Sequence, residues 1–171
     1  MSTRQIRKPY LLLIGDTQNL SNAKTAFGLR DWTPEACLGQ FRFNDSAVDI
    51  GLPNMSPAEA AAAGAGTLVI GIAPPGGLLP ESWHRAVLDA LNAGLDVAAG
   101  LHQRLAHVPE IRECAARLGR QVHDVRYTDT KFPIGTGARR PGRRVLTAGT
   151  DCAIGKKYTA LALGAFAWLA A

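Results

Sequence analysis

Two short runs of consecutive apolar residues restrict the fold of this 171-residue chain more than any other feature. Residues 9–15 read PYLLLIG and residues 67–73 read TLVIGIA, and neither run alternates with polar residues. Unbroken hydrophobicity over this length is typical of strands buried on both faces of a parallel sheet. We therefore expect both runs to form parallel strands inside one sheet.

Helix and strand signals alternate along the rest of residues 1–130. We expect further strands at residues 37–41, 95–99 and 122–127. Helices are expected at residues 21–31 with Ser21 as the cap, from the Ser56–Glu59 capping box to about residue 63, at residues 81–93, and at residues 109–118 before Gly119. This alternation predicts an α/β fold, a Rossmann-like three-layer domain with a parallel sheet, over residues 1–130.

The remaining forty or so residues predict a linker and the start of a second domain. Residues 131–144 read KFPIGTGARRPGRR, and their glycines and prolines break both helix and strand, so we expect a basic linker there. We expect a strand at residues 145–149 and a helix from Lys156 onward. Residues 145–171 would then be the first strand, phosphate loop and first helix of an incomplete P-loop NTPase-like domain.

Charge and composition exclude several classes of function. The net charge of +5 comes entirely from residues 132–171, because residues 1–131 hold 13 basic and 13 acidic side chains. A nucleic-acid surface would spread its cations over a folded face, so we expect no nucleic-acid partner. No membrane span and no signal peptide are visible, which predicts a cytoplasmic protein. The three cysteines are far apart and the histidines lack ligand spacing, so we expect no metal site.

The sharpest motif is the glycine-containing segment between the last expected strand and helix. It reads Gly149, Thr150, Asp151, Cys152, Ala153, Ile154, Gly155 and Lys156. Backbone N–H groups of such a loop converge on a phosphate at a helix N-terminus, and the lysine supplies a positive charge. Lys157 stands where P-loops carry a magnesium-binding hydroxyl, which weakens the case for magnesium-dependent ATP hydrolysis. A plain glycine turn with a solvated lysine is the alternative.

At this point the chain resembles the DgcN-type D-glutamate N-acetyltransferases, a bacterial family with a Rossmann-like N-terminal domain and a P-loop C-terminal domain. The resemblance rests on eight segments: KPYLLLIGD, AKTAFGLRDW, GLPNMSPAEAAAAGAGTLVIG, ESW, AGLDVAAGLHQRL, HDVR, FPIGTGARRPGRR and GTDCAIGKKYTALAL. The family typically carries methionine at the position of Lys157, and it continues well beyond the last helix here.

The resemblance implies transfer of acetyl from acetyl-CoA, as cosubstrate, to the amine of D-glutamate. Residues 149–152, 155 and 156 would anchor the phosphates of the donor. We expect this chain to be a fragment without turnover of its own, whose exposed Leu161, Phe166 and Trp168 favour self-association as a homo-oligomer. The alternatives are an ATP- and magnesium-dependent ligase of the dethiobiotin synthetase type and a non-catalytic domain that binds a small molecule.

Three residues at expected strand or helix ends are further candidates for the acceptor site. Asp16 follows the first strand and could bind a substrate amine, while Lys24 in the next helix could bind a carboxylate; a capping aspartate and a solvated lysine explain them equally well. His102 follows the strand at residues 95–99 and could act as a general base, although a structural histidine is the commoner case. The arginines at residues 139, 140, 143 and 144 could meet a coenzyme A phosphate or simply be solvated.

Overall fold

The computed structural model describes residues 5–128, 130–131, 133–139, 141–142, 144–150 and 154–169. It divides into two compact units, Met1–Thr128 and Asp129–Ala171. Asp151 and Cys152 of the expected phosphate loop, and Arg140 and Arg143 of the basic segment, lie outside the described residues.

The first unit is built on one sheet of five parallel strands. The strands are β1 (Tyr10–Gly15), β2 (Cys37–Arg42), β3 (Thr67–Ile70), β4 (Asp96–Ala99) and β5 (Val122–Asp124). Their order across the sheet is β2-β1-β3-β4-β5, and every neighbouring pair is parallel. Both apolar runs therefore form interior strands, as the sequence predicts.

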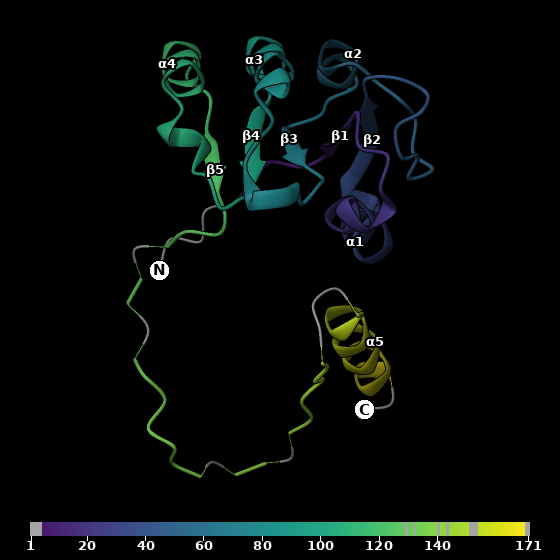
Figure 1. The fold of residues 1–171 in the computed structure, drawn as a ribbon, viewed down its shortest axis with the longest axis vertical. Helices are drawn as coiled ribbons and strands as arrows, with labels where there is room; N and C mark the ends of the chain where they lie inside the picture. The colour runs from purple at the N-terminus through teal and green to yellow at the C-terminus, as the bar shows by residue number, and fades with distance from the viewer. Residues whose placement is uncertain are drawn as a thin grey trace. The chain divides into compact units, whose positions relative to one another are not determined.

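Helices cover both faces of this sheet. They are α1 (Lys24–Trp32), α2 (Pro57–Ala62), α3 (His84–Asn92) and α4 (Pro109–Leu118), with short 3₁₀ turns at Leu20–Asn22, Pro34–Ala36, Pro75–Gly77, Glu81–Trp83 and Leu105–His107. In Figure 1, α2, α3 and α4 lie on one face of the sheet and α1 lies on the other. The predicted three-layer, Rossmann-like arrangement is confirmed.

Strand β1 explains why the apolar run had to be unbroken. Leu11 and Leu13 belong to the larger core cluster, whereas Leu12 and Ile14 belong to a second cluster with Ala26 of α1. Successive side chains of a strand point to opposite faces, so a strand covered on both sides needs an apolar residue at every position. All four side chains are fully buried.

The helix caps match the sequence at two places and differ at a third. Ser56 and Glu59 form the expected capping box at the start of α2, and Gly119 ends α4 in a left-handed conformation with φ 63°. Ser21 does not cap α1. Instead the Asn19 side chain accepts from the Ser21 N–H at 2.9 Å, because Asn19 starts a 3₁₀ turn that precedes the helix.

The second unit contains helix α5 (Lys156–Leu169). The expected strand at residues 145–149 is not formed: residues 144–149 carry neither helix nor strand. A strand is defined by hydrogen bonds to a neighbour, and within the described residues no segment pairs with this one. In the described part of the chain, no helix combines the length and apolar character needed to cross a membrane.

Candidate functional site

The sheet order reverses at the carboxyl ends of β1 and β3, which makes this edge of the sheet the candidate ligand-binding position. The chain moves from β1 to β2 on one side and then returns past β1 to β3 on the other. Open parallel sheets bind ligands outside the strand ends at such a reversal, because the loops there diverge to opposite faces. Asp16 directly follows β1, so it lies at this position.

Asp16 is held by a tryptophan that follows β3 in the chain. The Trp83 indole N–H donates to Asp16 Oδ1 at 2.9 Å, although the two residues are 67 positions apart. Trp83 is only 1% exposed, whereas Asp16 is exposed to solvent. Trp83 lies in the segment 81–93 for which the sequence predicts a helix, but its polar contact with Asp16 was not foreseen.

Gly15 makes room for this tryptophan. A Cβ atom at Gly15 would lie 2.0–2.4 Å from three carbons of the Trp83 indole, and the backbone there has φ 63°. Only glycine combines this conformation with such a close approach at low energetic cost. The residue before Asp16 thus allows the indole to lie directly against the end of β1.

The loop after β2 forms the other side of the Asp16 position. The Phe43 N–H donates to the Gly15 carbonyl at 2.9 Å, and the Val48 N–H donates to the Thr17 carbonyl at 2.7 Å. The Phe43 ring packs edge-on against Trp83 with ring centroids 5.4 Å apart. The loops after β1 and β2 are therefore held together next to the exposed Asp16.

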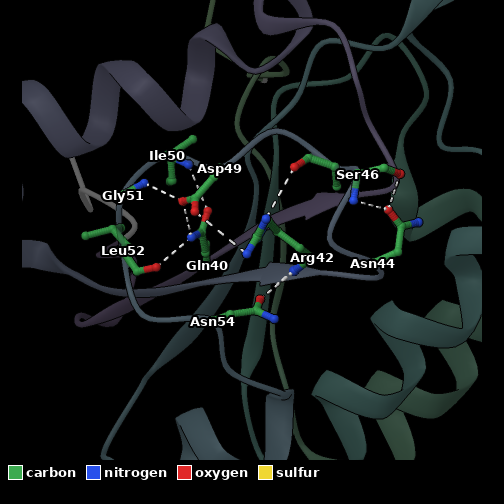
Figure 2. Close-up of polar contacts among 10 residues, drawn as sticks. Gln40, Arg42, Asn44, Ser46, Asp49, Ile50, Gly51, Leu52 and Asn54 are labelled. Atoms are coloured by element: carbon green, nitrogen blue, oxygen red, sulfur yellow. Dashed lines mark hydrogen bonds and ion pairs between the residues drawn. The ribbon is translucent and has the colours of Figure 1, made fainter.

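A polar network fixes this loop to β2 (Figure 2). Gln40 is 1% exposed; its amide nitrogen donates to Asp49 Oδ1 at 2.7 Å and to the Leu52 carbonyl, and its oxygen accepts from the Ile50 N–H at 2.9 Å. Figure 2 shows Gln40 at the centre of these contacts. Burying an amide costs little free energy only when its polar atoms form hydrogen bonds. The network therefore favours the one loop conformation in which Gln40 makes all these contacts.

Asp49 is the charged member of this network. Hydrogen bonds from the Gln40 side chain and the Gly51 N–H lower the pKa of the Asp49 carboxyl, and the Arg42 guanidinium lowers it further. Arg42 Nη2 lies 3.7 Å from Asp49 Oδ2. The sequence did not indicate Gln40 or Arg42 as candidates. Gln40 could have been noticed as the one amide side chain within the strand CLGQFR.

The structure does not bring the three acceptor-site candidates together. Asp16 and His102 follow β1 and β4, which are separated by β3, so their strand ends lie about 10 Å apart at the usual strand spacing. Lys24 is exposed in the first turn of α1. Within the described residues, Asp16 makes no hydrogen bond or ion pair with Lys24 or His102.

His102 lies in a separate loop contact. Its ring is so close to Gly77 that a Cβ there would be 2.6 Å from the ring Cγ, and its backbone N–H donates to the Gly77 carbonyl at 2.9 Å. Its own carbonyl accepts from the Tyr127 hydroxyl, and the Arg104 guanidinium lies 4.2 Å from the centre of the Tyr127 ring. These contacts order the β3 and β4 loops around an exposed imidazole.

The described part of residues 149–156 contains both glycines of the expected phosphate loop. A Cβ at Gly149 would lie 2.1 Å from Ile154 Cδ1 and 3.3 Å from Lys156 Cδ, and Gly155 has φ 95°. The positive φ of Gly155 favours glycine, whereas the atoms close to Gly149 belong to flexible side chains that can move aside. Lys156 begins α5, and the Thr147 hydroxyl donates to its carbonyl at 3.0 Å.

Two family models match the chain. Residues 42–128 match a domain of unknown function (DUF1611_N) described as a Rossmann-like domain, and residues 133–168 match the DUF1611_C P-loop domain. A crystal structure of a DUF1611 family protein from Anabaena variabilis ATCC 29413 has a TM-score of 0.77 at 29% identity, over 95% of this chain and 50% of that one.

Two curated relatives carry the name D-glutamate N-acetyltransferase. The protein from Tritonibacter scottomollicae is 44% identical over 160 residues, which is 94% of this chain, and the protein from a Pseudoalteromonas species is 40% identical over 159 residues, which is 93%. The chain spans about half the length of these relatives, 48% in each case. The N-terminal family model alone matches more than half of the residues of this chain. The chain therefore belongs to the DUF1611 family of paired Rossmann-like and P-loop domains.

Proposed function

We propose that the protein carrying this chain is a D-glutamate N-acetyltransferase. The observation that carries the proposal is the shared name of two curated relatives that match more than nine-tenths of this chain at 40–44% identity. The reaction needs an acyl donor site and a site for an acidic amino acid. The described residues offer candidates for both.

We assign the donor site to the loop before α5, with acetyl-CoA as the cosubstrate. Gly149, Thr150, Asp151, Cys152, Gly155 and Lys156 would hold its phosphates. The positive φ of Gly155 supports this assignment, because a loop that wraps an anion with backbone N–H groups needs glycine at such positions. The N-terminus of the 14-residue helix α5 adds the favourable end of a helix dipole.

In the transfer step, the free amine nitrogen attacks the thioester carbonyl carbon. The N–C bond forms, the C–S bond breaks, and the products are N-acetyl-D-glutamate and the free thiol of the donor. The ammonium proton must leave first, which assigns a base to the acceptor site. Asp16 is the candidate for the ammonium group and Lys24 for a carboxylate, both in the unit that carries the parallel sheet. His102 in the same unit is a candidate for the base; because its strand end lies about 10 Å from that of Asp16, this role requires a bridging water or a movement of its loop.

Titration calorimetry and an acetyl-transfer assay test the proposal together. We expect the protein to bind acetyl-CoA and to acetylate D-glutamate with release of thiol. Lys156→Ala should weaken acetyl-CoA binding about tenfold or more, the usual value of a charge-assisted contact to phosphate. Lys157→Ala is the matched control, because Lys157 is exposed at the neighbouring position.

Two results would overturn the proposal. One is tight magnesium-dependent ATP binding without acetyl-CoA binding, the behaviour of a P-loop ligase. The other is acetyl-CoA binding with no transfer to D-glutamate by the whole protein.

A further inference from the structure

The Asp16 carboxylate is exposed but held in place. One of its oxygens accepts from the buried Trp83 indole at 2.9 Å, and the loop that carries it is fastened to residues 43–48 by two backbone hydrogen bonds. A surface aspartate usually rotates freely in water. Here one oxygen is hydrogen-bonded by a buried ring, and within the described residues no hydrogen bond to the second oxygen is found.

Close contacts on both sides hold the Trp83 indole that binds Asp16. Trp83 reaches the carboxylate only because Gly15 lacks a side chain, and Phe43 packs against the other side of the same indole. Phe41 in turn packs edge-on against Phe43, with ring centroids 5.3 Å apart. A series of aromatic rings thus leads from β2 to the indole N–H that holds Asp16.

The charge of Asp16 has no compensating cation within the described residues. Its hydrogen bond comes from the indole N–H, which is neutral, and none of the ion pairs in the described part of the chain includes it. A fixed carboxylate beside the partly exposed ring of Phe43 attracts an ammonium group both by charge and by cation–π interaction. An anion would be repelled from the same position.

We propose that Asp16 binds the ammonium group of an amino acid and that Trp83 is its positioning residue. That the amino acid is D-glutamate rests on the proposed function; the ammonium site itself does not. Trp83 acts through Asp16: its N–H holds one carboxylate oxygen and so keeps the other directed at the ligand. The sheet reversal between β1 and β3 puts the site where α/β folds bind ligands.

The first experiment follows the Trp83 indole ¹⁵N–H signal by NMR in the 171-residue chain, assigned by its loss in Trp83→Phe. D-glutamate should shift this signal, whereas glutarate, the same dicarboxylate without the amine, should not at equal concentration. Asp16→Asn keeps an oxygen for the indole but removes the charge, so it should fold and bind D-glutamate at least tenfold more weakly. Trp32→Phe is the matched control and should bind as the unaltered chain does.

The second experiment measures acetyl transfer by the whole protein. Trp83→Phe and Asp16→Asn should each raise KM for D-glutamate about tenfold, with KM for acetyl-CoA unchanged, and the double variant should be no worse than Asp16→Asn alone. A merely structural tryptophan would lower activity without this split and would add to the Asp16 effect.

The outcomes separate the two proposals. If D-glutamate shifts the indole signal but no acetyl is transferred, the proposed function fails and the ammonium site stands. If transfer occurs while both variants keep the original KM, the ammonium site is wrong and the proposed function stands. Equal shifts by D-glutamate and glutarate, or no shift by either, also overturn the ammonium site.

Discussion

Replacing Gly15 by alanine tests the contact on which the Asp16 position depends. The new Cβ would lie 2.0 Å from the nearest Trp83 ring carbon, far inside van der Waals contact. The indole is 1% exposed and enclosed by the core, so it cannot swing away freely. Either the ring or the end of β1 must shift.

The size of the effect follows from two separate terms. An alanine in a left-handed conformation costs about 1–2 kcal/mol, and overpacking a filled core costs about a further 1–3 kcal/mol. Gly119 isolates the first term, because it has the same φ of 63° with nothing within 4 Å of its Cβ position. Gly15→Ala should therefore destabilise the chain by about 1–3 kcal/mol more than Gly119→Ala does.

Urea unfolding followed by tryptophan fluorescence measures both variants in the same way. The difference between their free energies of unfolding is the steric term alone. Equal losses would refute the reasoning, since they would mean that the indole yields without cost. In that case the rigid support that we infer for Asp16 would not exist.

Three further predictions concern the β2 loop and α5. Gln40→Leu should lower the free energy of unfolding by about 3 kcal/mol in urea titration, because the Ile50 N–H and the Leu52 carbonyl lose a buried partner; an unchanged midpoint would contradict this. The pKa of Asp49 is lowered from 3.8, so its contribution to stability is present above that pH and is lost as the pH falls through the folded-state pKa. Asp49→Asn should flatten the acid side of the stability profile between pH 6 and 2, taken as roughly the range of carboxyl titration, and an unaltered slope would show that Asp49 does not contribute. Phe166, 73% exposed on α5, should drive self-association that Phe166→Glu reduces in light scattering at several concentrations; identical scattering from both would count against it.

Local patterns predicted the layered fold because its causes are local. Unbroken apolar runs become interior parallel strands, since both faces of such a strand are covered, and β1 and β3 behave in this way. The capping box at Ser56 and the glycine at residue 119 predicted the start of α2 and the end of α4 because caps depend on a few consecutive residues. The cap of α1 was wrong because Asn19 starts a 3₁₀ turn whose first N–H and hydroxyl, both from Ser21, donate to its side chain, and α1 begins only at Lys24.

Contacts between distant residues decided the candidate site. Asp16 could be placed at a strand end from the sequence, but its partner Trp83 lies 67 positions away and reads as an ordinary core residue. The role of Gln40 could not be predicted from the sequence either, because its three partners belong to a loop whose path is known only after folding. Residues 145–149 were predicted to form a strand and do not, because an apolar run becomes a strand only where another strand pairs with it through hydrogen bonds. The sequence by itself determined which segments are buried and where they turn, because burial and capping are properties of short stretches. Which side chains meet at the end of β1 was decided only by the tertiary structure, because strand order brings together residues that no local pattern connects.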